Sequence, residues 1–394
     1  MIKNELKTPT LRFSDFTSDW ENKKLGDVCD IFRGGSPRPI EKFITTGKGV
    51  NWLKIGDVPL DGKYVNQTKE KIINEGVIKS RTVNIGDFIL SNSMSFGRPY
   101  IMNINACIHD GWLALSQYSN NFYKEFLYYS ISSKYIYKQF SSMASGSGVK
   151  NLNKNSVSKI KIKIPSMEEQ NKIAGFLSSV DKRIDLLQQK HDTFIQYKNA
   201  LMQGLFPQKG QTNPSMRLND KNNNPFTKNW ENKKLGDVCD KESSKTVVGN
   251  ISENGLYTVY GASGICGKIT TYISEKPYIG IVKDGAGVGK LFFCEKNTSI
   301  LGTLNKISEK KNINILFLYY LFKKINFQKY VIGSTIPHIY FKDYSKEKLK
   351  IPSIEEQNKI AGFLSAVDKK IENISNQLNQ SKQFKKSLMQ KMFI

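Results

Sequence analysis

The chain has 394 residues, which is enough for two or three domains that each bury a core. It carries 59 Lys and Arg against 35 Asp and Glu, a net charge of +24. Such a charge predicts a polyanionic partner, most commonly nucleic acid. No signal peptide or run of 18 apolar residues is visible, so we expect a cytoplasmic protein without a membrane partner.

A short motif opens each half of the chain. Trp20–Asp30 reads WENKKLGDVCD, and Trp230–Asp240 repeats all eleven residues. Each copy is followed by short β-like runs separated by glycine and proline turns. These two bodies cannot be aligned with each other by eye. Looser echoes are FLYY at Phe126–Tyr129 and Phe317–Tyr320, and GSGVKNL at 146–152 against GSTIPHI at 333–339. One scaffold with two different bodies suggests one task performed on two targets.

A longer repeat ends each half. IPSMEEQNKIAGFLSSVDKRI at Ile164–Ile184 and IPSIEEQNKIAGFLSAVDKKI at Ile351–Ile371 differ at three of 21 positions. Ser166 with Glu169, and Ser353 with Glu356, form capping-box patterns at a helix start. The apolar residues that follow recur every 3.5 residues, as in a coiled-coil seam. The predicted seam residues are Ile173, Leu177, Val180, Ile184 and Leu187 in the first helix and Ile360, Leu364, Val367, Ile371 and Ile374 in the second.

Two polar seam residues favour an antiparallel pair of helices. In a parallel pair Lys198 would meet Lys385, and like charges repel. In an antiparallel pair Lys198 lies near Val367 and Lys385 near Val180, where each lysine stem can extend to water. The alternative is two unrelated amphipathic helices packed on separate domains.

The predicted fold class is α+β with a pseudo-twofold internal repeat. We expect globular α/β bodies at 1–165 and 225–352, and long helices at 166–206 and 353–394 that form the antiparallel coiled coil. A polar linker rich in Pro, Gly, Asn and Gln should occupy 207–224.

The sequence predicts no catalytic or metal centre. KDGAGVGKL at Lys283–Leu291 fails the phosphate-loop pattern at both Asp284 and Leu291, so a glycine turn between strands is the better interpretation. Asn224-Pro225-Phe226 lacks the second proline of an amino-methyltransferase motif. The five cysteines form no CxxC pair, and the three histidines are scattered.

The repeated order of opening motif, body and IPxxEEQxxIAxxLxxxDxxI helix resembles the specificity subunit of type I restriction-modification systems. Phe32–Val58 is similar to the opening of a typical first target-recognition domain, and Tyr257–Gly267 to another common type. Leu11–Val28 matches the usual start of the family. The second start departs from it, because Met216-Arg217-Leu218 stands in place of Leu11-Arg12-Phe13.

The resemblance implies a non-catalytic subunit whose two domains each bind one half of a bipartite, asymmetric double-stranded DNA site. The helices would set the unread gap and dock two methylation subunits, which bring S-adenosylmethionine. Two restriction subunits would add ATP- and Mg²⁺-dependent translocation and cleavage, so we expect no cofactor in this chain. A protein-binding coiled-coil scaffold is the alternative. Expected docking residues are Glu169, Gln170, Gly175, Glu356, Gln357 and Gly362.

Loop residues with side chains suited to DNA are the candidate contacts. We predict Arg33, Arg38, Asn92, Arg98, Lys150 and Asn151 in the first body, and Lys268, Lys283, Lys290, Thr335 and His338 in the second. No arginine occurs between Leu218 and Pro352. The second domain therefore cannot bind guanine through a bidentate arginine.

Overall fold

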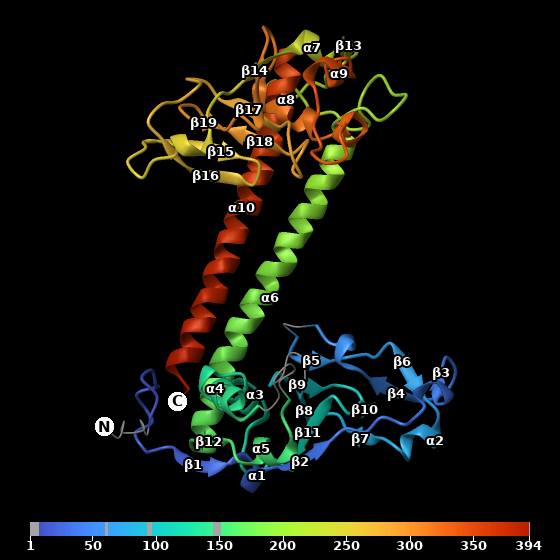
Figure 1. The fold of residues 1–394 in the computed structure, drawn as a ribbon, viewed down its shortest axis with the longest axis vertical. Coiled ribbons are helices and arrows are strands. Elements are labelled where there is room, and N and C mark those ends of the chain that lie inside the picture. Colours follow the sequence, from blue (N-terminus) through green and yellow to red (C-terminus); the bar gives the residue numbers. More distant parts are fainter. Residues whose placement is uncertain (1–7, 60–61, 93–96, 145–150, 394) are drawn as a thin grey trace. The chain divides into compact units, whose positions relative to one another are not determined.

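A computed structural model describes residues 8–59, 62–92, 97–144 and 151–393 (Figure 1). The chain divides into two units, Met1–Gln188 with Asn376–Ile394, and Gln189–Ser375. Each unit contains a β-rich domain and a part of both long helices (Figure 1). The predicted α+β class is therefore confirmed. Within the described residues, no helix is both long and apolar enough to cross a bilayer.

Both opening motifs form a strand and a short helix beside the start of a long helix. The first gives β1 (Glu21–Lys24) and α1 (Leu25–Val28), the second β13 (Glu231–Lys234) and α7 (Leu235–Val238). β1 pairs antiparallel with β12 (Lys161–Ile164), and β13 pairs in the same way with β21 (Lys348–Ile351). β12 leads into α6 (Met167–Gly204), and β21 leads into α10 (Ile354–Lys391). Each opening motif thus lies against the segment that enters its repeat helix.

The first domain contains two five-stranded sheets. One has the order β2-β11-β8-β9-β5, with bounds β2 (Asp30–Arg33), β5 (Tyr64–Val65), β8 (Phe88–Ser91), β9 (Pro99–Met102) and β11 (Trp112–Ser116). The other has the order β3-β6-β4-β10-β7, with bounds β3 (Ile44–Thr45), β4 (Val50–Leu53), β6 (Glu70–Ile72), β7 (Arg81–Val83) and β10 (Ala106–Ile108). The accompanying helices are α2 (Asn74–Val77), α3 (Lys124–Ile131), α4 (Lys134–Met143) and α5 (Lys154–Ser158).

The second domain also has two sheets. The four-stranded sheet has the order β14-β20-β17-β18, with bounds β14 (Cys239–Ser243), β17 (Tyr278–Val282), β18 (Leu291–Cys294) and β20 (Leu304–Glu309). The three-stranded sheet has the order β16-β15-β19, with bounds β15 (Tyr257–Gly261), β16 (Gly264–Ile269) and β19 (Ser299–Ile300). The accompanying helices are α8 (Ile315–Phe322), which contains FLYY, and α9 (Phe341–Tyr344).

The two domains share one topology, although their sequences could not be aligned by eye. The antiparallel core β2-β11-β8-β9 corresponds strand for strand to β14-β20-β17-β18. In the second sheets, β4 and β10 form a parallel pair, as do β15 and β19. β6 and β16 then pair antiparallel with β4 and β15. The two bodies differ in sequence, as expected, yet share this common core, to which the first domain adds the edge strands β5, β3 and β7.

The long helices pack antiparallel, as predicted, and this can be seen within each unit separately. In the first unit, Ile173 and Leu177 of α6 share a core with Leu388 and Met392 of α10. In the second unit, the end of α6 packs against the start of α10, through Leu201, Leu205, Ile360, Leu364 and Val367. The remaining predicted seam residues are buried or half-buried: Val180, Ile184, Leu187, Ile371 and Ile374.

Both seam lysines form an ion pair that the sequence did not predict, and their side chains are only partly exposed. Lys385 Nζ lies 2.6 Å from an Asp181 carboxylate oxygen. Lys198 forms the equivalent ion pair with Asp368. Each aspartate directly follows the valine, Val180 or Val367, past which the lysine stem was expected to extend. An ion pair with the neighbouring helix thus adds to the partial solvation of each lysine.

A buried ion pair begins each repeat helix. The Arg12 guanidinium donates two hydrogen bonds of 2.7 Å to the Glu169 carboxylate, and Arg217 binds Glu356 in the same bidentate way at 2.9 and 2.5 Å. The Glu169 backbone N–H donates to Ser166 Oγ, as the capping pattern predicts. Arg217 lies in the segment predicted as a linker, so this part of 207–224 has a structural role.

Neighbouring backbone bonds repeat the same arrangement in both halves. The Leu11 N–H donates to the Lys391 carbonyl at the end of α10, and the Met216 N–H donates to the Gly204 carbonyl at the end of α6. Met216-Arg217 therefore corresponds to Leu11-Arg12 despite the different spacing to the following tryptophan.

Breaking one of these ion pairs should strongly destabilise its unit. Arg217→Met leaves the Glu356 carboxylate buried without its cation, and we expect the free energy of unfolding to fall by about 3–5 kcal/mol. Urea unfolding followed by circular dichroism measures this loss. The Arg217→Met/Glu356→Leu double variant should recover most of it, because no buried charge remains.

The control for this prediction is Lys228→Met. Lys228 pairs with Glu231, but the two side chains are 74% and 54% exposed. Its removal should change the free energy of unfolding by less than about 1 kcal/mol. Equal effects of Arg217→Met and Lys228→Met would contradict the importance of the buried pair.

Candidate nucleic-acid interface

Several loops of the first domain meet at one end of its central sheet. The Asn92 N–H, directly after β8, donates to the Gly111 carbonyl just before β11. The Gly35 N–H, after β2, donates to the Ile108 carbonyl, and the Leu152 N–H donates to the Asn92 carbonyl. These bonds bring together three loops and the segment that begins at residue 151. We call this group of loops at the sheet end the gathering of the first domain. The predicted residues Arg33, Arg38, Asn92 and Asn151 all belong to it.

Asp110 is the electrostatic centre of the gathering. Its carboxylate accepts a hydrogen bond of 2.8 Å from Ser36 Oγ and lies 3.4 Å from Arg38 Nη2 and 3.0 Å from His109 Nε2. Arg33 Nε donates to the Asp110 carbonyl at 3.3 Å. Partial burial alone would raise the pKa of Asp110, but the Ser36 hydroxyl and the nearby cations outweigh burial and lower it. The Asp110 carboxylate therefore pairs with Arg38, and the Asp110 backbone carbonyl holds Arg33.

The predicted residues of this domain differ in what they can contact. Arg33, Arg38, Arg98 and Asn151 are exposed. Asn92 is only 5% exposed, and its side-chain amide donates to the Asp110 carbonyl at 2.9 Å. The prediction for Asn92 is corrected, because this side chain holds the loop together and is not available to DNA. Lys150 lies outside the described residues.

The equivalent loops of the second domain repeat the same hydrogen bonds. The Lys283 N–H, directly after β17, donates to the Thr303 carbonyl before β20 at 2.9 Å. The Ile339 N–H donates to the Lys283 carbonyl at 3.0 Å. These two bonds match those that Asn92 makes with Gly111 and Leu152 in the first domain. Lys283 of the second domain therefore occupies the place that Asn92 has in the first.

Four of the five predicted residues gather there. Lys283 forms an ion pair with Asp284, and His338 makes two backbone hydrogen bonds of 2.9 Å with Ile332. Thr335 is exposed in the turn between them, and Lys290 is exposed at the start of β18. Lys290 Nζ donates to the Ser263 carbonyl just before β16, whereas Lys268 lies near the other end of that strand, roughly 15 Å away. It is not part of the gathering.

The turn beside His338 requires its glycine. Gly333 has a φ of +85°, which disfavours any side chain. A Cβ atom there would also lie 2.6 Å from the Ile336 carbonyl oxygen. The shape of this loop is thus fixed by its backbone, which leaves Thr335 and His338 in defined positions.

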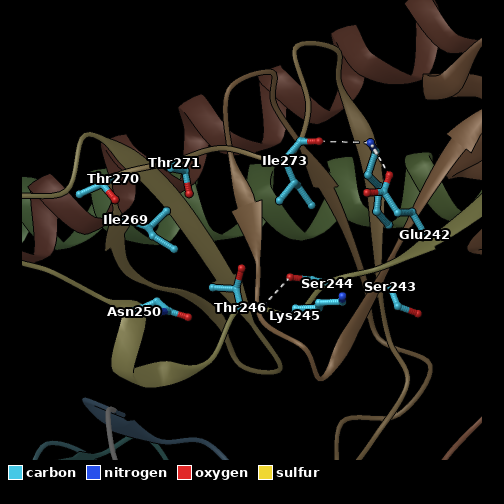
Figure 2. Close-up of a pocket in the computed structure, with 11 residues that line it drawn as sticks. Glu242, Ser243, Ser244, Lys245, Thr246, Asn250, Ile269, Thr270, Thr271 and Ile273 are labelled. Atoms are coloured by element: carbon cyan, nitrogen blue, oxygen red, sulfur yellow. Dashed lines mark hydrogen bonds and ion pairs between the residues drawn. The ribbon is translucent and has the colours of Figure 1, made fainter.

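A polar pocket beside the second gathering was missed from the sequence (Figure 2). It lies between the segment that follows β14 and the end of β16, with a volume of about 540 Å³. The Ser244 hydroxyl donates to the Ile300 carbonyl, and the Gly302 N–H donates to the Thr246 carbonyl. Most lining side chains carry hydroxyl, amide or amine groups: Ser243, Ser244, Lys245, Thr246, Asn250, Thr270, Thr271 and Lys306. The available signal was the polar run KESSKTVVGN at 241–250, which begins within β14 and continues past its end.

Other residues missed from the sequence lie in the first domain. Ser36, His109 and Asp110 line a pocket together with the predicted Arg38. Arg81 and Lys154 both lie over the ring of Phe32, at 5.1 and 5.8 Å from its centroid. Phe32 lies in β2, Arg81 in β7 of the other sheet and Lys154 in α5, so these contacts come from tertiary packing that no local sequence pattern shows.

Four of the six predicted docking residues are buried. Glu169 and Glu356 bind arginines, as described above. Gln170 accepts from the Tyr123 N–H at 2.9 Å, and Gln357 accepts from the Asn314 N–H at 2.9 Å, at the starts of α3 and α8. These four side chains are 1–2% exposed, so the prediction that a partner contacts them is corrected.

The two predicted docking glycines are different, because both are exposed on the helix surface. No atom lies within 4 Å of a Cβ built on Gly175 or on Gly362. Close packing inside the chain therefore does not require glycine at either position.

Each half of the chain thus contains a β-rich domain with polar and basic loops at one end of its central sheet. Each domain is joined to a long helix that packs against the long helix of the other half. The family described as "Type I restriction modification DNA specificity domain" matches residues 17–193 and 227–383. The chain therefore belongs to that family and contains its domain twice, which confirms the resemblance drawn from the sequence.

Relatives and solved structures agree with this assignment. The chain is similar to the type I restriction enzyme MjaVIII specificity subunit of Methanocaldococcus jannaschii, with 25% identity covering 94% of this chain and 91% of the relative. The MjaIX specificity subunit of the same organism is 22% identical over 95% of this chain and 92% of the relative. The crystal structure of a type I S subunit from M. genitalium has the same fold, with a TM-score of 0.67, 17% identity and coverage of 98% and 99%.

Asp110→Asn tests the electrostatic centre of the first domain. The folded-state pKa of Asp110 is lowered from the ordinary value of about 3.9. Its ionised form therefore stabilises the fold above about pH 4, and this contribution disappears as the pH falls through the folded pKa. We expect the variant to be about 1 kcal/mol less stable at pH 7 and to match the wild type at the acid end. Thermal unfolding of the variant and the wild type between pH 7 and pH 3 measures the stability difference at each pH. A difference that does not change with pH would contradict the role given to the ionised Asp110.

Proposed function

We propose that this chain is the non-catalytic DNA-reading subunit of a type I restriction-modification complex, in which each domain binds one half of a bipartite site. One observation carries the proposal. The two domains share a core topology and present chemically different loops at the same end of their corresponding central sheets. Each domain is joined to a repeat helix, and the starts of the two helices are nearly identical in sequence. A duplicated frame with different reading loops suits an asymmetric double-stranded DNA target.

The side chains at the two sheet ends suit different bases. Arg33 and Arg38 can each form the bidentate contact with guanine that the first domain allows. The second domain offers Lys283 and Lys290 with hydroxyl and imidazole groups, which read a base edge without a guanidinium. The net charge of +24 supplies the attraction to phosphates that precedes base reading.

The exposed start of each repeat helix is the proposed docking face for a methylation subunit. It comprises Met167, Glu168, Asn171 and Gly175 in α6, and Ile354, Glu355, Asn358 and Gly362 in α10. These residues lie on one side of the helix because they are one, four and eight positions from its first residue. Two such faces suit two methylation subunits that carry S-adenosylmethionine. Restriction subunits would bring the ATP- and Mg²⁺-dependent step.

Sequencing of modified bases in genomic DNA tests the proposal directly. Cells with and without this gene are compared while the methylation subunit is present. We expect N6-methyladenine to disappear at one motif made of two short blocks and a fixed gap. Unchanged methylation would contradict the proposal and favour the protein-binding scaffold.

Single substitutions should change one block of that motif and leave the other intact. Arg38→Ala should relax a base in one block, and Lys290→Ala should affect only the other, by about 1–3 kcal/mol for a base contact. If either residue binds phosphate instead, affinity should fall for all sequences and the salt dependence should become shallower. Lys268→Ala is the matched control from outside the gathering. A single substitution that changes both blocks of the motif would contradict the assignment of one block to each domain.

Arginine at the exposed glycines should block docking without unfolding the chain. Gly175→Arg and Gly362→Arg each meet open space, so the helices should remain folded. Each variant should lose one of two methylation subunits, and the double variant should lose both. Light scattering of the purified complex measures the stoichiometry. Gly175→Ala is the control, expected to keep docking and to stabilise its helix by up to about 1 kcal/mol. Full assembly of the double arginine variant would rule out this face.

A further inference from the structure

A cluster of three polar side chains links three elements in the first unit. Asp181 of α6 accepts a hydrogen bond of 2.7 Å from the Tyr129 hydroxyl of α3 through one carboxylate oxygen. Its other oxygen lies 2.6 Å from Lys385 Nζ of α10. One carboxylate thus joins the recognition domain, its own repeat helix and the repeat helix of the other half. We call this group the first clasp.

The second unit contains the same cluster. The Tyr320 hydroxyl of α8 donates to Asp368 of α10 at 2.8 Å, and Lys198 of α6 forms an ion pair with the other oxygen of that carboxylate. Tyr320 and Asp368 hold the same places in their repeats as Tyr129 and Asp181. The lysine again comes from the opposite helix. We call this group the second clasp.

Each clasp is partly shielded from solvent. Burial raises the pKa of Tyr129 and of Tyr320, so both phenols stay protonated and donate to the aspartates. In the first unit, Lys63 lies over the rings of Tyr64, Tyr128 and Tyr129, at 5.3, 5.0 and 4.8 Å from their centroids. The contacts around Tyr129 leave its ring little freedom to move.

An apolar seam alone does not define how two helices are aligned along their length. A shift of one heptad, about 10 Å, replaces one set of apolar contacts by another similar set. A lysine bound to a single aspartate does not tolerate such a shift, because its partner moves out of reach. Polar groups at a seam are known to specify register in this way even where they add little stability. The tyrosine extends the same constraint to the recognition domain.

We propose that the two clasps are positioning devices that fix how each recognition domain is held on the helix pair, and thereby fix the gap length that the protein accepts. This inference rests on the proposed function, since a gap has meaning only for a bipartite DNA site. A domain that can shift or turn on its helices would present its reading loops at more than one spacing. Loss of a clasp should therefore relax the choice of gap more than it weakens methylation at the correct gap.

The test uses the complete complex with its methylation subunits and a panel of DNA duplexes. The duplexes carry both half-sites at the native gap, or at a gap one base pair shorter or longer. The measured quantity is the rate of methyl transfer on each, and its ratio between native and altered gaps is the selectivity. The variants are Lys385→Met and Lys198→Met, which keep the length of the seam side chain, and Tyr129→Phe and Tyr320→Phe, which keep the ring.

For each lysine variant we expect gap selectivity to fall about tenfold, equivalent to about 1.4 kcal/mol, while the rate at the native gap changes less than about threefold. The clasps lie in different units, so the double lysine variant should multiply the two losses. Lys385→Arg should retain selectivity. Lys382→Met is the matched control on α10, because Lys382 is exposed and makes a long hydrogen bond of 3.5 Å to Gln188.

Two results would overturn the inference. Unchanged selectivity in both the lysine and the tyrosine variants would show that the clasps do not set the gap. An equal loss of rate at every gap would show a purely structural role. A wild-type complex that methylates without any dependence on half-sites would instead refute the proposed function itself, so the two failures are distinguishable.

Discussion

The buried carboxylate at the start of each repeat helix is the interaction on which the rest of each half depends. An unpaired carboxylate at 1% exposure, such as that of Glu169, would cost several kcal/mol, so the helix start can be buried only when Arg12 is in place. The next residue, Gln170, binds the backbone at the start of α3. Two adjacent side chains therefore hold the opening segment, the recognition domain and the long helix in one arrangement.

This junction explains part of the near identity of the two repeats without any partner. Glu356 and Gln357 make the same contacts in the second half, so their identity follows from internal packing. Gly175 and Gly362 cannot be explained in this way. A glycine inside a helix costs about 1 kcal/mol relative to alanine, and neither glycine has an internal neighbour that requires it. Under the proposed function, a partner surface that approaches both helices closely would account for both glycines.

The parts of the structure that depend on local pattern could be predicted from the sequence. The 3.5-residue period gave the long helices, and Lys198 and Lys385 together indicated their antiparallel direction. Partners distant in sequence could not be found in this way. The ion pairs of both lysines with Asp368 and Asp181 depend on how the helices face each other, and the common topology of the two domains depends on strand pairing. Asn92 looked like a DNA contact because it ends a strand in a polar loop, yet strand pairing turns its amide inward to Asp110.

The equivalent of Asn92 in the second domain is Lys283, and this pair shows how one fold can carry different side chains at the same place. Both backbones make the same two hydrogen bonds, so the sheet end is built identically whatever side chain follows. The side chains then differ freely: an amide turned into the loop in one domain, and an ammonium group paired with Asp284 in the other. A guanidinium reads guanine by a rigid pair of donors, whereas lysine offers a mobile point charge. Under the proposed function, base selection in this arginine-free domain would combine lysine with hydroxyl, amide and imidazole groups held by a fixed backbone, and the turn at Gly333 and the polar pocket beside β14 provide such groups.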